Sequence, residues 1–328
     1  MEHIGHRDDR RLHAAILAGS VLLLFLLLCP SLRAAEFELV KDAQGVTVRV
    51  DGKLFTRYLK RSGAKPIFWP VIGPSGKEMT RGYPMREPIA TEKKDHIHHR
   101  SMWFTHGDVN GVSFWHESKG HGNIEHRKYL QVEGGKQGVL ETLNDWIGPS
   151  GKRFCQDRRR FVFHADDKHR WIDVELTVMA SDGPVTFGDT KEGSFGVRVA
   201  GSMRTERPDG GTIVNSRGHR DKAAWGKQAE WVDYHGPVEG ETVGIAIMNH
   251  PSSFRFPTYW HVRTYGLFTA NPFGWHQFRR DNSLDGSYRL AKGESFTLRY
   301  RVLLHLGDHK EGDVVRFYRN YAASDGHP

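Results

Sequence analysis

Short stretches in which apolar and polar residues alternate, each ended by a turn dipeptide, constrain the fold of this chain more than any other feature. Residues 46–50 alternate, Asp51-Gly52 follows them, and residues 53–59 alternate again. An Asp-Gly pair between two alternating runs is a strong signal for a β-hairpin. Similar runs occur at residues 160–164, 170–179, 194–199, 243–248, 265–270 and 295–304. The pattern predicts an all-β protein built of antiparallel strands.

One segment departs from this pattern. Residues 311–323 place Val314, Phe317 and Tyr321 at helical spacing, which predicts one short C-terminal helix. No repeat, low-complexity tract or linker divides residues 36–328, and 9 tryptophans with 38 % apolar residues suffice for a core. We therefore expect a single domain over residues 36–328, folded as one large antiparallel β-sandwich.

Residues 1–35 have the features of an export signal. Three arginines (Arg7, Arg10, Arg11) precede the apolar run 14–28, and small residues end the segment. The run is shorter than the ~20 residues that a membrane-spanning helix needs, so we expect cleavage and no stable membrane span afterwards. The mature chain is then periplasmic or secreted. Cys29 leaves lipoprotein anchoring as an alternative, although Leu28 is bulky where a small residue is typical.

The charge of the chain narrows the choice of partners. Removing residues 1–35 from the 47 Lys+Arg and 39 Asp+Glu leaves 43 basic and 36 acidic residues, a net charge of +7. The basic residues are spread out and form no nucleic-acid-binding motif, so we expect no nucleic-acid partner. A modest positive field favours acidic ligands instead. Cys155 is the only cysteine after residue 35, which excludes an internal disulfide and predicts a structural thiol.

Histidines are concentrated in one segment. Seven of the 17 histidines after residue 35 lie between His96 and His126, where an even distribution would place about two. If residues 95–100 are extended, His96 and His98 share one face and His99 takes the other. Paired imidazoles can act as acid and base, contact a sugar ring or bind a divalent metal ion. The alternative is that they only bond to loops beneath the core. We assign His96, His98 and His99 to catalysis, His96 and His98 also to a metal, and Arg100, Trp103, His106, Asp108 and Asn110 to substrate binding.

A second segment, residues 249–274, combines aromatic, imidazole, guanidinium and amide side chains. Aromatic faces cover the apolar side of a sugar ring, while Arg, Asn and His side chains bond to its hydroxyls. Between the two segments, residues 186–198 form a glycine-rich turn whose carboxylates serve acid–base chemistry or are simply solvated. From these segments we assign His250, His261, Asp189 and Glu192 to catalysis, and Lys191, Trp260, Arg263 and Asn271 to substrate binding. Trp260 is equally well explained as a core residue.

These segments resemble a bacterial family known as PmoA-like, which is named after a methane oxygenase subunit. The resemblance is carried by residues 95–103, 106–111, 186–199, 225–227, 231–234, 250–251, 260–263 and 271–274, within residues 83–304. A membrane oxygenase needs several apolar spans, so the resemblance does not bring that activity to this chain. It implies instead an exported protein of bacteria that degrade complex polysaccharides. Its order of elements is similar to the galactose-mutarotase supersandwich, which binds sugars on one open sheet face. Aldose epimerases of that fold pair a histidine acid with a carboxylate base, here His250 or His261 with Asp189 or Glu192.

Three functions remain open on this sequence. The first is a carbohydrate-active enzyme (epimerase, hydrolase or lyase) that uses both segments as one pocket for a sugar, including an acidic or sulfated one. The second is a metalloenzyme in which His96 and His98 bind Zn, Cu or Fe, although no metal motif such as His-Glu-x-x-His is present. The third is a non-catalytic glycan-binding module.

Overall fold

Two eight-stranded antiparallel sheets form most of the computed structural model, which describes residues 1–2 and 35–326. The predicted export signal, apart from Met1, Glu2 and Ala35, lies outside the described residues. In spatial order, the first sheet consists of β1 (Phe37–Lys41), β2 (Gly45–Val50), β3 (Lys53–Ser62), β4 (Lys65–Val71), β5 (Met102–His106), β11 (Gly193–Arg198), β16 (Leu267–Asn271) and β15 (Tyr259–Val262). The second consists of β12 (Thr212–Asn215), β13 (Trp231–Val238), β14 (Glu241–Asn249), β18 (Ser295–Leu306), β9 (His169–Met179), β8 (Arg153–Ala165), β7 (Gly138–Ile147) and β6 (Asn123–Glu133).

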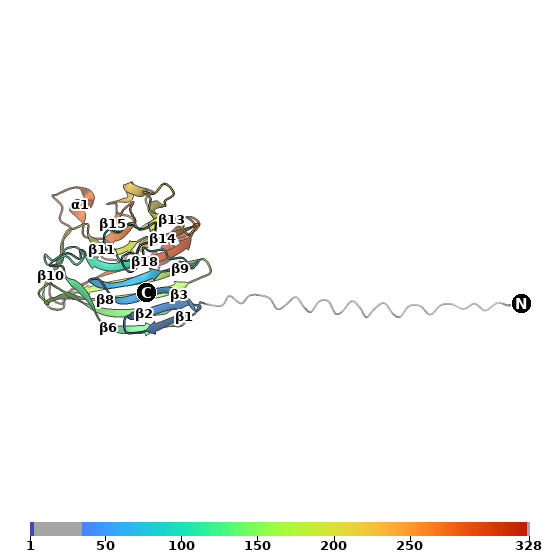
Figure 1. The fold of residues 1–328 in the computed structure, drawn as a ribbon, viewed down its shortest axis with the longest axis horizontal. Coiled ribbons are helices and arrows are strands. Elements are labelled where there is room, and N and C mark those ends of the chain that lie inside the picture. Colours follow the sequence, from blue (N-terminus) through green and yellow to red (C-terminus); the bar gives the residue numbers. More distant parts are fainter. Residues whose placement is uncertain (3–34, 327–328) are drawn as a thin grey trace. The chain divides into compact units, whose positions relative to one another are not determined.

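Aromatic side chains from the two sheets meet in one core. Figure 1 shows the strands of the two sheets as ribbons. Phe68 of β4 contacts Phe161 of β8 with ring centroids 4.6 Å apart. Phe195 of β11 stacks on Tyr300 of β18 at 5.3 Å. The predicted all-β antiparallel sandwich is therefore confirmed. The predicted hairpin is present too, since Asp51 and Gly52 have φ angles of 50° and 74° and join β2 to β3.

Shorter elements lie outside the two large sheets. They are the two-stranded pair β10 (Val185–Phe187) and β17 (Tyr288–Leu290), the 3-10 helices η1 (Gly201–Met203) and η2 (Asp221–Ala224), and the helices α1 (Trp275–Arg279) and α2 (Val314–Ala322). The predicted C-terminal helix corresponds to α2, whose Val314, Phe317 and Tyr321 pack on the outer face of the second sheet. The structure adds one helix that was not predicted, α1, which is only 5 residues long and too short to show a helical period. Within the described part of the chain, no helix is long and apolar enough to cross a membrane.

The outer face of the first sheet has a row of side chains that runs across five strands. His261 on β15 pairs with Thr269 on β16, which pairs with Gly196 on β11; Gly196 pairs with Trp103 on β5, and Trp103 with Ile67 on β4. Their neighbours along each strand point into the core between the sheets. A Cβ on Gly196 would lie 2.9 Å from Thr269 and 3.0 Å from Trp103, so this glycine makes room for the indole. The histidine segment covers one end of this row, where His99 stacks on the Trp103 ring.

Candidate functional site

The predicted histidine segment folds over the outer face of the first sheet as a turn. The expectation that residues 95–100 are extended was wrong, because the His99 N–H donates to the His96 carbonyl oxygen at 2.9 Å. The turn stacks the His96 and His99 rings at 4.8 Å and brings His98 to 4.5 Å from His99. His116, from the loop after β5, lies 4.9 Å from His98. Four imidazoles thus form one cluster.

Two buried arginines hold this turn in place. Arg81 bonds to the Asp95 carboxylate at 2.6 Å and to the backbone carbonyls of His96 and His99 at 2.9 and 3.1 Å. Arg198 on β11 reaches the same carboxylate at 3.1 Å and donates to His99 Nδ1 at 3.0 Å. A guanidinium can only donate, so His99 Nδ1 carries no proton and its ring is neutral. Burial and the Arg198 charge accordingly lower the pKa of His99 well below its ordinary value.

Trp103 and Arg100 support the cluster from beneath. Trp103 is 2 % exposed and stacks on His99 with ring centroids 5.5 Å apart. It was expected to contact the substrate, but His99 covers it. Arg100 forms two bonds to Glu117, at 2.9 and 2.6 Å, and the fully buried Lys65 adds a third at 3.3 Å. Burial raises the pKa of Glu117, but these cations outweigh it and lower the pKa to about 2. Arg100 therefore fixes the residue next to His116.

Glu192, directly before β11, brings a carboxylate to the cluster. Its side chain is 20 % exposed and pairs with the Lys191 ammonium at 2.8 Å. Burial raises the pKa of Glu192, yet Lys191 and the nearby His261 and His116 outweigh burial, so the pKa lies below its ordinary value. Glu192 is therefore a carboxylate at neutral pH. It also interacts electrostatically with His98.

His261 faces Glu192 from the edge strand β15. Its Nδ1–H donates to the Lys191 carbonyl oxygen at 2.8 Å, which leaves Nε2 as the unprotonated nitrogen of the neutral ring. Burial lowers the pKa of His261 to about 4, although Glu192 opposes that shift. The ring can therefore accept a hydrogen bond or a proton through Nε2 at neutral pH.

Aromatic and cationic side chains form the rim of this site. Tyr265 stacks on His96 at 5.2 Å, and Trp225 meets the His261 ring at 6.2 Å. The exposed Arg263 lies over both, 5.6 Å from the Tyr265 ring and 6.0 Å from the Trp225 ring. His116, Trp225 and Tyr265 were not among the assigned site residues, although all three lie in or beside the segments that the sequence singled out.

A basic groove continues from this rim along β15. It has a volume of about 930 Å³ and shares Trp225 with the site. Its lining includes Arg217, Lys222, Lys227, Arg279 and Arg280 together with the apolar faces of Tyr259 and Phe278. No carboxylate is among the described residues that line it. The sequence does not reveal this groove because its arginines and lysines come from separate loops.

Several assigned residues have structural contacts instead. Asp189 accepts bonds from the backbone N–H groups of His276 and Gly286, at 3.1 and 2.6 Å, and so joins loops. His106 is fully buried and its Nε2–H donates to the Gly188 carbonyl oxygen at 2.8 Å. His250 lies at the end of β14 against Tyr321 of α2, with ring centroids 4.9 Å apart. Of the four acid–base pairs that the resemblance allowed, the structure brings together only Glu192 and His261.

Four further assigned residues also serve the fold. Asp108 accepts the Gly111 N–H and Asn110 accepts the Thr186 N–H, so both shape turns. Trp260 is fully buried in the core and donates to the Ala229 carbonyl oxygen, as its alternative interpretation predicted. Asn271 donates to the Thr190 carbonyl oxygen at 2.8 Å and accepts the Phe273 N–H at 2.9 Å. Their amide, carboxylate and indole groups are therefore already engaged within the protein.

The neutral state of the His98 and His261 imidazoles is testable by NMR. Burial, with His116 and Lys65, lowers the pKa of His98 to about 3, and burial lowers that of His261 to about 4. Both rings should therefore stay neutral from pH 5.5 to 8, and their Cε1–H signals should not shift over that range. Signals are assigned by their loss in His98→Ala and His261→Ala. A midpoint near pH 6.5 for either ring would contradict the burial argument.

Comparison with known proteins places the chain in a family and relates it to solved structures. No curated protein matches it in sequence. A GH36 α-galactosidase from Geobacillus stearothermophilus is similar at 10 % identity and a TM-score of 0.41; the match covers 83 % of this chain and 41 % of that one. A galactose mutarotase-like protein from Lactobacillus casei ATCC 334 is similar at 8 % identity and a TM-score of 0.38, covering 82 % and 100 %. A Glycoside Hydrolase Family 97 enzyme from Pseudoalteromonas sp. strain K8 has 12 % identity and a TM-score of 0.32, covering 83 % and 34 %.

The chain thus spans about two fifths of the length of the α-galactosidase. The resemblance to the PmoA-like family is not tested by these matches and stays a prediction. A family match extends over residues 45–319, which include every strand from β2 to β18 and the residues of the site. On this match, the chain belongs to the family described as "Family of unknown function (DUF6807)".

Proposed function

We propose that the chain binds a carbohydrate on the outer face of its first sheet and carries out acid–base chemistry on it there. One observation carries this proposal. The Glu192 carboxylate lies close enough to the imidazoles of His98, His116 and His261 to interact with them electrostatically. An ionised carboxylate and a neutral imidazole with a free nitrogen are the groups that remove and return a proton at a ring carbon or hydroxyl. Glu192 serves as the base, and an imidazole of the cluster bonds to the sugar oxygen.

The rim of the site suits a sugar ring. Trp225 and Tyr265 offer aromatic faces to its apolar C–H side, while Arg263 supplies donors to its hydroxyl groups. Because Arg263 is exposed and shared between the two rings, it is free to reorient toward a ligand. This combination of one stacking surface and a few polar groups is typical of carbohydrate sites.

The substrate that we propose is acidic, such as a uronate-containing oligosaccharide. The supporting feature is the groove beside Trp225, whose arginines and lysines face no lining carboxylate. Sugar units beyond the one at Glu192 can extend into it, and their carboxylates can pair with Arg279 and Arg280. We further propose that the protein acts after export, because polysaccharide fragments are met outside the cytoplasm and residues 1–35 have the features of an export signal.

The test is to incubate the full chain in D₂O with tri-galacturonate and, separately, with neutral galactotriose. One-dimensional proton NMR then reports new anomeric signals, bond cleavage or loss of a ring C–H signal through exchange. We expect a change with the acidic sugar. Binding detected by isothermal titration calorimetry without any change in the sugar identifies a glycan-binding module instead. The absence of both binding and chemical change would contradict the proposal.

A charge-removing variant of the groove tests the acidic substrate separately. Arg279→Gln/Arg280→Gln should weaken tri-galacturonate binding about three- to tenfold, because exposed ion pairs are each worth up to about 1 kcal/mol. Higher salt should reduce the difference. The matched control is Arg127→Gln/Lys128→Gln, which removes two exposed cations from β6 and should leave affinity unchanged. Equal weakening by both variants would mean that only net charge matters.

A further inference from the structure

A second cluster of titratable side chains lies on the outer face of the other sheet. Asp233 and His235 alternate along β13 with the core residues Val232 and Tyr234, so they point away from the core. Asp233 is 0 % exposed, and its Oδ1 bonds to His235 Nδ1 at 2.6 Å. A fully buried carboxylate needs a cation or several donors to offset the loss of water.

One hydrogen-bond donor is already in place behind Asp233. His305 on β18 bonds through Nε2 to Asp233 Oδ2 at 2.8 Å, and its Nδ1–H donates to the Leu306 carbonyl oxygen at 3.1 Å. Gly244 and Gly312 enclose this ring, since a Cβ on either would lie within 2.2 Å of it. His305 therefore fixes one carboxylate oxygen and leaves the other, Oδ1, facing His235.

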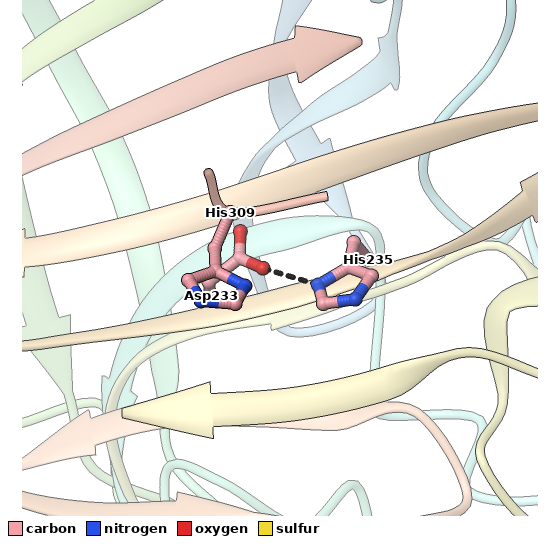
Figure 2. A group of neighbouring side chains, drawn as sticks. All are labelled: Asp233, His235 and His309. Atoms are coloured by element: carbon pink, nitrogen blue, oxygen red, sulfur yellow. Dashed lines mark hydrogen bonds and ion pairs between the residues drawn. The ribbon is translucent and has the colours of Figure 1, made fainter. Parts of the chain in front are cut away.

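A third group, His309, approaches from the loop between β18 and α2. Its Nδ1 is buried and has no hydrogen-bond partner among the described residues. Its ring stacks on that of His235 with centroids 5.8 Å apart. One ligand atom each from Asp233, His235 and His309 lies within 4.8 Å of the other two. Figure 2 shows the three side chains, with the Asp233–His235 bond dashed and His309 arriving from a separate segment.

We propose that Asp233, His235 and His309 bind a divalent transition-metal ion of the zinc type. Two imidazoles and one carboxylate are the ligands that such an ion prefers, and His305 is the outer partner that orients a ligating carboxylate. When the ion binds, the neutral His235 ring carries its hydrogen on Nε2 instead of Nδ1, so that His235 Nδ1 and Asp233 Oδ1 exchange their mutual bond for bonds to the ion. The orphaned nitrogen of His309 gains a partner at the same step.

Small side-chain rotations suffice to form the site. Tetrahedral zinc with ligand bonds near 2.1 Å keeps its ligand atoms about 3.4 Å apart. Asp233 and His235 lie closer than that at 2.6 Å, and the widest separation in the group is below 4.8 Å. Three protein ligands also leave a coordination position open, as in catalytic zinc sites. A cavity of about 730 Å³, lined by His309 and Trp231 and by the exposed side of α2, lies beside it.

This site differs from the metal site expected at His96 and His98. Among the described residues, the group whose ligand atoms come this close together contains neither of these histidines. The two histidine clusters lie on outer faces of different sheets, so a metal at one does not depend on the other. Variants of each cluster therefore separate the two assignments.

The experiment measures Zn²⁺ binding to the full chain without a polyhistidine tag. Chelator-treated protein is dialysed against Zn²⁺, and bound metal is counted by mass spectrometry; Co²⁺ substitution reports ligand geometry through its visible absorption. We expect the wild type to bind one more Zn²⁺ per chain than His309→Ala does. Any Zn²⁺ binding that remains at this site in the variant should be at least tenfold weaker. Zn²⁺ should also raise the melting temperature of the wild type and not of His309→Ala.

His309→Ala is the safe variant, because His309 lies in a loop and its Nδ1 leaves no partner unsatisfied. Its melting temperature without metal should match that of the wild type. The control His96→Ala/His98→Ala should keep full Zn²⁺ binding. Equal Zn²⁺ binding by wild type and His309→Ala would overturn the proposal, as would loss of binding only in His96→Ala/His98→Ala.

Discussion

Glu192→Gln should reduce the rate of sugar turnover by roughly 10²–10⁴-fold, the range expected when a general base is lost. The amide has the size of the carboxylate and can still accept a hydrogen bond, so affinity for tri-galacturonate should change little. The pKa of Glu192 is lowered because Lys191, His261 and His116 outweigh burial, so the wild-type side chain is ready to accept a proton at neutral pH. The loss therefore falls on kcat rather than on KM.

The measurement is the initial rate of the NMR-detected change with tri-galacturonate in wild type and variant. Glu125→Gln on β6 is the matched control, since it makes the same chemical change at an exposed position and should leave the rate unchanged. A Glu192→Gln rate within twofold of the wild type would remove Glu192 as the base. In that case the remaining candidates are the imidazoles of His98, His116 and His261.

The fold was predictable because its signals are local. Alternation in residues 46–50 and 53–59, with Asp51-Gly52 between them, determines a hairpin within 14 residues of chain. The same period recurs in β9, β14 and β18. In contrast, α1 depends on tertiary packing, since its Phe278 stacks on Tyr259 of β15. No local hydrophobic periodicity predicts this helix.

The site was predictable only in part, because its geometry comes from strand order. Glu192 and His261 meet because β11, β16 and β15 are neighbours in the first sheet. Nothing in the sequence of residues 186–198 distinguishes Glu192 from Asp189, which is three positions earlier. In the structure, the Glu192 carboxylate faces the histidines, whereas the Asp189 carboxylate accepts hydrogen bonds from loop N–H groups. The same holds for His250, which the end of β14 directs to α2. Asp233 and His235 lie two positions apart on β13, but His309 is far from them in sequence and joins them only through the order of β13, β14 and β18 in the second sheet.

Asp95→Asn should destabilise the protein by about 3 kcal/mol at pH 7. Its Oδ1 accepts bonds from both Arg81 and Arg198, whose side chains are each 1 % exposed. Removing the carboxylate that pairs with two buried guanidinium groups typically costs ~3–5 kcal/mol, and the 29 % exposure of Asp95 places the effect at the lower end. The melting temperature should fall by roughly 5–10 °C for a domain of this size. Since Arg81 and Arg198 hold the turn of His96 and His99, sugar binding should weaken as well.

The dependence on pH separates this charge effect from a loss of packing. Burial raises the pKa of Asp95, but Arg198 and Arg81 outweigh it, so the folded pKa lies below the ordinary value near 4. The charge therefore stabilises the fold fully above that value and stops doing so as pH falls through the folded pKa. Urea unfolding should show the largest gap between wild type and Asp95→Asn at pH 7 and a smaller one near pH 3. Asp42→Asn, which disrupts an exposed pair with Arg57, should have little effect at either pH. An Asp95→Asn deficit that is equally large at both pH values would mean that the amide disturbs the turn by its shape, and that the two arginines do not need the charge.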